Sequence, residues 1–285
     1  MTGDVLSGTK AESASDNDLG SREGNPLTPL GVGTAHTLGK MQADLAAGRR
    51  NLMSKLLPSP LYNVSSGQSL ASSDGSTCAI FQIRAGWVCQ FHNLASGRKA
   101  IIDIFLTGDV IGLDTALRVR PLQATLALTS VTASVLRGQN TLHDLMACQH
   151  TALYISWLLA QRQQRADQLL TSISSLDARG RVATMLLDIY TRLRRRRLIT
   201  GSTYNLPLTQ VQIGSYLGLT VVHINRVLRS LREERIAHVE KHCVSILDLG
   251  RLRALAQREN LESSTVPNSN PPLSATALTS NEVAA

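Results

Sequence analysis

The chain has 285 residues, of which 43% are hydrophobic and 18% charged, and its formal net charge is +8. A chain of this length and apolar content can bury a sizeable core and form more than one domain. No apolar run approaches the roughly 20 residues of a membrane span, so a membrane partner is not expected. The excess of positive charge favours a polyanionic partner instead.

Both ends of the chain are rich in small and polar residues. Residues 1–40 contain much Gly, Ser, Thr, Asp and Pro with little periodic apolar content, which predicts a disordered N-terminal segment. Residues 259–285 have the same character and predict a disordered tail. The first residues also lack the apolar region of a secretion signal, so a cytoplasmic location is expected.

Cysteine spacing argues against disulfide and zinc frameworks. The four cysteines are widely separated and form no CxxC pair: Cys78, Cys89, Cys148 and Cys243. Such scattered residues are typical of buried thiols rather than of a disulfide framework or a zinc site.

The first half of the chain predicts a short helix and then a small β structure. The helix is expected at residues 41–57. Short β-rich runs follow between glycine and polar turns: Ala79–Arg84, Trp87–Phe91, Ala100–Phe105, Leu126–Leu128 and Thr132–Leu136. Strands this short and this closely spaced predict a sandwich or a roll.

A long helix is predicted from Leu142 to Ile173, because neither Pro nor Gly interrupts this stretch. Apolar residues recur along it with heptad spacing and form a candidate dimer interface: Leu142, Leu145, Ala152, Leu159, Ala166 and Leu170. Polar residues at other a positions make this seam imperfect. The alternative is that the helix packs only on its own domain.

The next helix is predicted to begin after Asp177, a candidate N-cap, and to present Val182, Leu186, Ile189 and Leu193 on one face. A dense cluster of basic residues lies near its end: Arg192 and Arg194–Arg197. These cations can serve an anionic partner, or they can simply complement the negative end of the helix dipole.

Residues 208–247 predict a helix, a tight turn, a second helix and a β-hairpin. Thr209 and Gln212 have the spacing of a capping box, and Gly218 is placed to end the first helix. Thr220 is the candidate N-cap of the second helix, whose apolar stripe is Ile224, Leu228 and Leu231. Alternating runs at 236–240 and 244–247, around a turn at 241–242, predict the hairpin.

These motifs resemble the DNA-binding domain of the Crp/Fnr superfamily of transcription factors over residues 206–255. The resemblance is carried by LPLTQ, YLGLT, VVHINRVLRSLREE and ILDLGRLRAL. Residues 85–117 resemble, more weakly, the sensor domain of the same superfamily, chiefly at Gly97, Gly108, Asp109 and Gly112. The implied fold class is α+β, with a cupin-like, cyclic-nucleotide-binding-like β-roll, a long dimerisation helix and a winged helix-turn-helix.

The resemblance divides the chain into a β-roll sensor-like domain at 41–140, a dimerisation helix at 141–175 and a DNA-binding domain at 176–258. It implies a homodimeric transcription regulator that binds double-stranded DNA at a two-fold symmetric site. RNA polymerase is a further expected partner if the protein activates transcription. No enzyme motif is evident: the β-rich region holds only His92, which is too few histidines for the metal site of a cupin enzyme.

The resemblance also implies contact residues on the second helix, which would be the recognition helix. Its exposed face is predicted to meet base edges through Val222, His223, Asn225 and Arg226. Phosphate contacts are predicted for Thr209, Gln210, Thr220, Arg229 and Lys241. Members of the superfamily commonly carry Glu four residues before the Arg, where this chain has Val222.

Cofactor motifs of the superfamily are missing. Leu113, Gln123 and Ala124 stand where cyclic-nucleotide-binding members have Glu, Arg and Ser. Arg118 or Arg120 could substitute after a loop shift, so a cyclic-nucleotide-responsive regulator with an atypical pocket is kept as an alternative. No N-terminal cysteine cluster exists for an iron–sulfur centre, and His92 alone is a weak haem ligand. The nearest resemblance is to FixK-like members, and a protein-interaction module is a further alternative.

Overall fold

The computed structural model describes residues 32–70, 79–117, 124–138 and 140–256. The chain divides into two compact units, Met1–Leu38 and Gly39–Ala285. Of the first unit only the start of helix α1 (Val32–Leu56) is described. All elements that follow α1 belong to the second unit. Cys78, Arg118, Arg120 and Gln123, and the tail from 257, lie outside the described residues.

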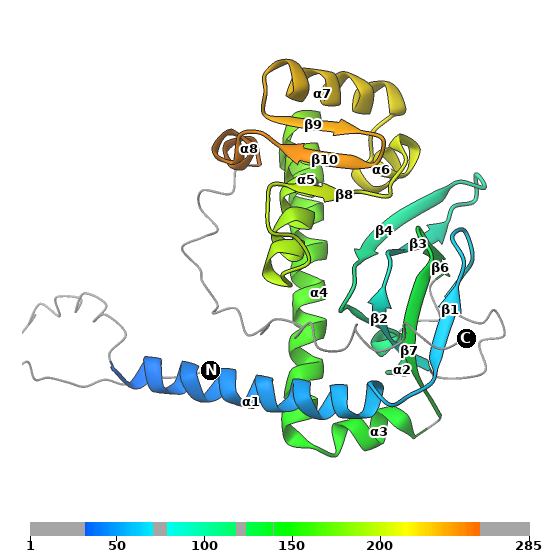
Figure 1. The fold of residues 1–285 in the computed structure, drawn as a ribbon, viewed down its shortest axis with the longest axis vertical. Helices are drawn as coiled ribbons and strands as arrows, with labels where there is room; N and C mark the ends of the chain where they lie inside the picture. The colour runs from blue at the N-terminus through cyan, green and yellow to red at the C-terminus, as the bar shows by residue number, and fades with distance from the viewer. Residues whose placement is uncertain (1–31, 71–78, 118–123, 139, 257–285) are drawn as a thin grey trace, which may run out of the picture. The chain divides into compact units, whose positions relative to one another are not determined.

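Two antiparallel sheets form the β-roll (Figure 1). The first has the order β1-β7-β2-β5 and the second β4-β3-β6. Their strands are β1 (Leu61–Val64), β2 (Ala79–Ala85), β3 (Val88–Asn93), β4 (Lys99–Phe105), β5 (Val110–Ile111), β6 (Ala124–Ala127) and β7 (Val131–Arg137). The five predicted β runs all form strands, whereas β1 and β5 were not predicted. A one-turn helix, α2 (Leu113–Ala116), follows β5.

The core of the roll is filled by alternating strand residues, among them Phe81, Ile83, Val88, Phe105 and Val135. The turn before β5 contains Gly108, whose φ of 92° lies in the left-handed region that favours glycine. This turn places Asp109 at the edge of the roll, where its carboxylate meets the helices described below.

The helices next to the roll differ from the sequence prediction in two ways. Helix α1 begins at Val32, so residues 32–40 are helical although they were expected to be disordered. The predicted continuous helix at 142–173 is wrong: α3 (Thr141–Met146) and α4 (Gln149–Ser175) are separate helices, with Cys148 in an extended conformation between them.

The break between α3 and α4 coincides with the approach of α1. A Cβ atom at Gly48 would lie 1.9 Å from the backbone oxygen of His150, so α1 packs against the start of α4 with no room for a side chain. Leu52, Ile80, Leu145 and Ile155 are buried together around this contact. Tertiary packing therefore decides where the helix is interrupted, although no local helix breaker is present.

The C-terminal part combines helices with a three-stranded sheet of order β8-β10-β9. Its elements are α5 (Ala178–Arg195), β8 (Thr203–Asn205), α6 (Gln210–Leu217), α7 (Val221–Glu233), β9 (Ala237–Glu240), β10 (Cys243–Ile246) and α8 (Leu249–Leu255). Asp177 caps α5 as predicted, accepting a hydrogen bond from the Gly180 N–H at 2.8 Å. The strand β8 was not predicted.

A buried ion-pair cluster joins the roll to α5. One carboxylate oxygen of Asp109 lies 2.8 Å from an Arg192 nitrogen, and the other lies 2.5 Å from an Arg196 nitrogen. The Leu106 N–H also donates to this carboxylate at 2.7 Å. Burial by itself would raise the pKa of Asp109, but Arg196 and then Arg192 outweigh it and hold the pKa well below its ordinary value.

These contacts exclude Arg192 and Arg196 from the predicted role of the arginine cluster in binding an anionic partner. The side chains of Arg192 and Arg196 are only 11% and 13% exposed, and they also donate to the backbone carbonyls of Ile104 and Thr107. They are therefore internal partners of the roll and are not available to an external polyanion. Arg194, Arg195 and Arg197 remain exposed.

Asp109→Asn should destabilise the protein. Among the described residues, the change leaves Arg196 without a counter-charge and Arg192 with Asp188 alone, which we expect to lower the free energy of unfolding by about 3 kcal/mol. Denaturant titration at neutral pH measures the loss. Asp144→Asn is the matched control, because that carboxylate is exposed. A loss of the same size in the control would show that the Asp109 cluster is energetically unimportant.

The difference in stability between the wild type and Asp109→Asn should depend on pH. Because folding lowers the pKa of Asp109, its contribution is fully present above the unfolded value of about 3.9 and is lost as the pH falls below it. The difference in unfolding free energy between wild type and Asp109→Asn should thus stay constant above that pH and narrow in more acidic solution.

Candidate nucleic-acid interface

Helix α6 begins with the capping box that the sequence predicts. The Gln212 N–H donates to the Thr209 hydroxyl at 3.2 Å, and the Thr209 N–H donates to the Gln212 side chain at 2.8 Å. The Thr209 hydroxyl accepts in this pair, so its own proton is free to be donated outward.

The turn between α6 and α7 depends on two glycines. Gly218 ends α6 with a φ of 66°, as its predicted role requires. At Gly214 a Cβ atom would lie 2.5 Å from the backbone oxygen of Leu219, so the chain folds back directly over this residue. The corner is therefore too tight for a side chain at position 214, and it fixes the direction in which α7 leaves.

Thr220 caps α7 as predicted. Its hydroxyl accepts from the His223 N–H at 3.3 Å and lies 3.0 Å from the His223 Nδ1 atom. Ile224, Val227 and Leu231 form the buried side of the helix. Leu228, which the sequence placed in the apolar stripe, is only half-buried, and Val227 takes the inner position.

The opposite side of α7 is exposed. Val222 is 76% exposed, and the side chains of His223, Asn225, Arg226 and Arg229 are exposed beside it. Within the described part of the chain, no carboxylate forms an ion pair with Arg226 or Arg229. The helix thus presents two unneutralised cations, one amide and one branched apolar group on one face.

The wing is a tight hairpin. β9 pairs with β10 from Glu240↔Cys243 to Ala237↔Ile246. The two turn residues between them, Lys241 and His242, have φ values of 46° and 64°. Positive φ at both positions is typical of the type I′ turn, whose twist matches that of the strands. Both side chains are exposed, so the wing carries a cation at its tip.

The remaining candidate phosphate-contact residues are also at the surface. Thr209, Gln210 and Thr220 are exposed at the N-terminal ends of α6 and α7. Backbone N–H groups at such ends point outward and favour anions. Thr220 differs from the prediction in one respect, because its hydroxyl is already engaged by His223.

The candidate dimer residues are less uniform than the sequence implied. Leu145 is only 1% exposed and packs in the core of its own chain, so it cannot form an interface with a partner. Leu142 lies on α3 and, like Ala152 and Leu159 of α4, is half-buried. Ala166 is exposed and Leu170 is 67% exposed, which leaves the C-terminal half of α4 open.

The described cysteines, and the residues at the superfamily's cofactor positions, differ in how far they are buried. Cys89 is buried, Cys148 is partly exposed and Cys243 is exposed, so the expectation of buried thiols holds for the first only. Leu113 is buried at 3% exposure, and Ala124 begins β6. His92 is exposed near the end of β3.

A helix pair with a glycine corner, an exposed cationic second helix and a type I′ wing define a winged helix-turn-helix DNA-binding domain. Residues 180–255 match the family model described as the Crp-like helix-turn-helix domain. None of the described helices has both the length and the apolar character needed to cross a membrane.

Known proteins resemble the chain over a longer stretch. It is 24% identical over 199 residues to the transcriptional regulatory protein btr of Bordetella pertussis, covering 69% of this chain and 81% of that one. It is 28% identical over 194 residues to the transcriptional activator protein FnrA of Stutzerimonas stutzeri, covering 67% and 78%. The structure of FixK2 from Bradyrhizobium japonicum matches with a TM-score of 0.61 at 23% identity, covering 69% and 96%. Residues 180–255 thus form a Crp-like helix-turn-helix domain, and over about two thirds of its length the chain is similar to transcription regulators of the Crp/Fnr type.

Gly218→Ala should destabilise the fold through the backbone alone. A Cβ atom there meets nothing within 4 Å, but the left-handed φ costs an L-residue about 1 kcal/mol. Gly201→Ala is the control, since position 201 is equally open and has no positive φ. Denaturant titration measures the free energy of unfolding of both variants. Equal stabilities of the two would contradict the predicted cost of the left-handed backbone at position 218.

Proposed function

We propose that the protein acts as a homodimer that binds a two-fold symmetric DNA site in a sequence-specific manner. The observation that carries this proposal is the exposed face of α7, where Arg226 and Arg229 have no described counter-charge. A cation that its own protein leaves unneutralised is available for a nucleic-acid partner. Relatives named as transcription regulators support the same class of activity.

Base contacts are assigned to the first turns of α7. The guanidinium of Arg226 can donate two hydrogen bonds to the O6 and N7 atoms of guanine. Val222 has no hydrogen-bonding group, so it can only contact an apolar feature such as the methyl group of thymine. Asn225 and His223 supply the remaining polar groups. With Nδ1 held near the Thr220 hydroxyl, the His223 Nε2 atom is the one left to face the DNA.

Phosphate contacts are assigned to groups that flank this face. These are the Thr209 hydroxyl, the exposed N-terminus of α6 at Gln210, the α7 N-terminus at Thr220, and the cations of Arg229 and Lys241. Such contacts place the protein on the duplex without reading sequence. A dimer would bring two recognition helices into successive major grooves about 34 Å apart.

Dimerisation is assigned to α4 between Ala152 and Leu170. The exposure of Leu170 supports this, because a leucine on a regular helix is better stabilised when a partner covers it. Leu145 is excluded from this interface because it is buried in its own chain. RNA polymerase is a further partner if the protein activates transcription, and the DNA target implies the cytoplasm as the site of action.

A cyclic-nucleotide effector is not part of the proposal. The position that would need a carboxylate for the ribose is Leu113, whose side chain is packed inside the protein. Neither an iron–sulfur cluster nor haem is proposed, since the sequence has no cysteine cluster and His92 stands alone in the β-rich region.

Arg226→Ala and Lys241→Ala should weaken DNA binding in different ways. Arg226→Ala should cost about 1–3 kcal/mol on the preferred site and relax the preference at one base pair. Lys241→Ala should weaken all sequences alike and reduce the salt dependence of binding. Site selection from random DNA, followed by titrations at two salt concentrations, measures both effects. An unchanged selected motif for Arg226→Ala would exclude it as a base-reading residue.

Leu170→Glu should disrupt the dimer, because it would bury a charge in an apolar seam. We expect a monomer in sedimentation velocity that binds half-sites weakly. Leu61→Glu is the control, since Leu61 is 61% exposed in β1 outside the proposed interface. A variant at position 170 that sediments as the wild type does would place the interface elsewhere.

A further inference from the structure

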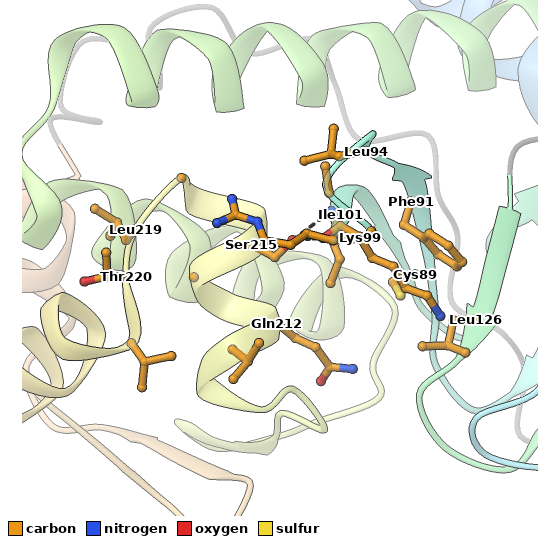
Figure 2. A pocket seen from close by; sticks show the side chains of 17 residues that line it. Cys89, Phe91, Leu94, Lys99, Ile101, Leu126, Gln212, Ser215, Leu219 and Thr220 are labelled. Carbon is orange, nitrogen blue, oxygen red and sulfur yellow. Dashed lines mark hydrogen bonds between the residues drawn. The ribbon is translucent and has the colours of Figure 1, made fainter.

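A cavity of about 720 Å³ lies between the β3–β4 hairpin of the roll and the helix-turn-helix. Figure 2 shows Phe91, Leu94 and Leu126 on the roll side, and Gln212, Leu219 and Thr220 on the helix-turn-helix side. We call it the hairpin cavity. Its volume is within the range of sites that hold small organic ligands, which is about 300–1,000 Å³.

One wall of the hairpin cavity is fixed by hydrogen bonds. The Ser215 hydroxyl of α6 accepts from the Ile101 N–H at 3.1 Å and donates to the Lys99 carbonyl at 2.6 Å. β4 is at the edge of its sheet, so these two backbone groups have no neighbouring strand on this side. A single side chain therefore satisfies both groups and holds α6 against the roll.

The cavity surface is largely apolar. Phe91, Leu94, Ile101, Leu126 and Leu219 contribute side chains, and Cys89 is buried among them. Burial raises the pKa of the Cys89 thiol to about 11, and the nearby Lys99 only partly offsets this effect. At neutral pH the thiol is thus uncharged, and this part of the wall remains apolar.

The charged groups at the cavity are all of one sign. Arg98 and Lys99 line it, and no acidic side chain does so among the described residues. The Lys99 ammonium lies 4.5 Å from the centre of the Phe91 ring, so it is positioned directly above an apolar surface. An apolar pocket with cations on one side suits a ligand that has an apolar body and an anionic end.

The other wall consists of the turn that sets the recognition helix. Gly218, Leu219, Thr220 and Val221 line the cavity, and Thr220 is the N-cap of α7. A ligand in contact with these residues touches the segment that fixes the direction of α7. Binding in the cavity and binding of DNA can therefore affect each other, and any such coupling must be reciprocal.

We propose that the hairpin cavity is an effector site for a small organic acid, of which a medium-chain carboxylate is the simplest representative. The carboxylate interacts with Lys99 and Arg98. The apolar chain lies against Phe91, Leu126 and Leu219. This assignment goes beyond the DNA-binding function proposed above, and it uses none of the residues assigned to base reading.

Three probes of equal length test the ligand class on the full-length protein: octanoate, octanol and octylammonium. By calorimetry, octanoate should bind saturably at one site per chain, with octanol about fivefold weaker and octylammonium weaker still. Equal affinities for octanoate and octylammonium, or no saturable binding of octanoate at millimolar concentration, would overturn the proposal.

Variants locate the site. Lys99→Glu should weaken octanoate binding by about tenfold, and Lys99→Gln by a smaller factor, because one reverses the charge and the other only removes it. The matched control is Arg50→Glu, an equal charge change at an exposed position of α1 outside the cavity. If the two reversals weaken octanoate equally, the effect is one of overall charge and the cavity is not the site.

The effector role needs a separate measurement. Saturating octanoate should change the dissociation constant of the wild-type protein for its selected DNA site by about fivefold or more. The Lys99→Glu variant should show no such change at the same concentration. An unchanged constant for the wild type would exclude an effector role. Calorimetric binding of octanoate is measured without DNA, so failure of the ligand site can be told apart from failure of the proposed DNA-binding function.

Discussion

The placement of the DNA-binding segment depends on one buried carboxylate. Asp109 receives hydrogen bonds from Arg192, Arg196 and a backbone N–H, so a turn of the roll is fixed to the last turn and the C-cap of α5. Asp103 extends this arrangement, since its carboxylate lies 3.3 Å from Arg162 and 3.1 Å from Arg165 of α4. Among the described residues, removing Asp109 would leave the Arg196 guanidinium without an acidic partner, and removing Asp103 would do the same to Arg165, which costs more than losing an ordinary contact. The roll and its neighbouring helices are therefore held by complementary charges as much as by apolar packing.

Because Arg192 and Arg196 are used internally, they add nothing to the exposed cations of α7 and the wing or to Arg194, Arg195 and Arg197. The net charge of +8 alone gives a misleading picture of where an anion would be attracted. Arg192 and Arg196 contribute to that number but are covered, whereas Arg226 and Lys241 are exposed. Local burial, more than overall composition, decides which cations can act in recognition.

Local signals predicted the helix-turn-helix well. The capping box at Thr209, the end of α6 at Gly218 and the cap at Thr220 each rest on interactions within three or four residues, so the sequence contains the whole cause. Several features that depend on distant residues were missed. These are the break at Cys148, the partners of Arg192, and the strand β8, which pairs only because β10 lies beside it. Burial of Leu145 belongs to the same group, since heptad spacing cannot tell a partner's surface from the chain's own core.

The two hydrogen bonds of Ser215 have a consequence for solubility. An uncovered edge strand can pair with a strand from another molecule, and this is a common route to aggregation. At β4 the Ile101 N–H and the Lys99 carbonyl, which would begin such pairing, are both taken by one hydroxyl of α6. The adjacent Arg98 and Lys99 add positive charge that repels a second copy of the same edge. Helix α6, the first helix of the helix-turn-helix, thus also protects the roll from forming intermolecular sheet.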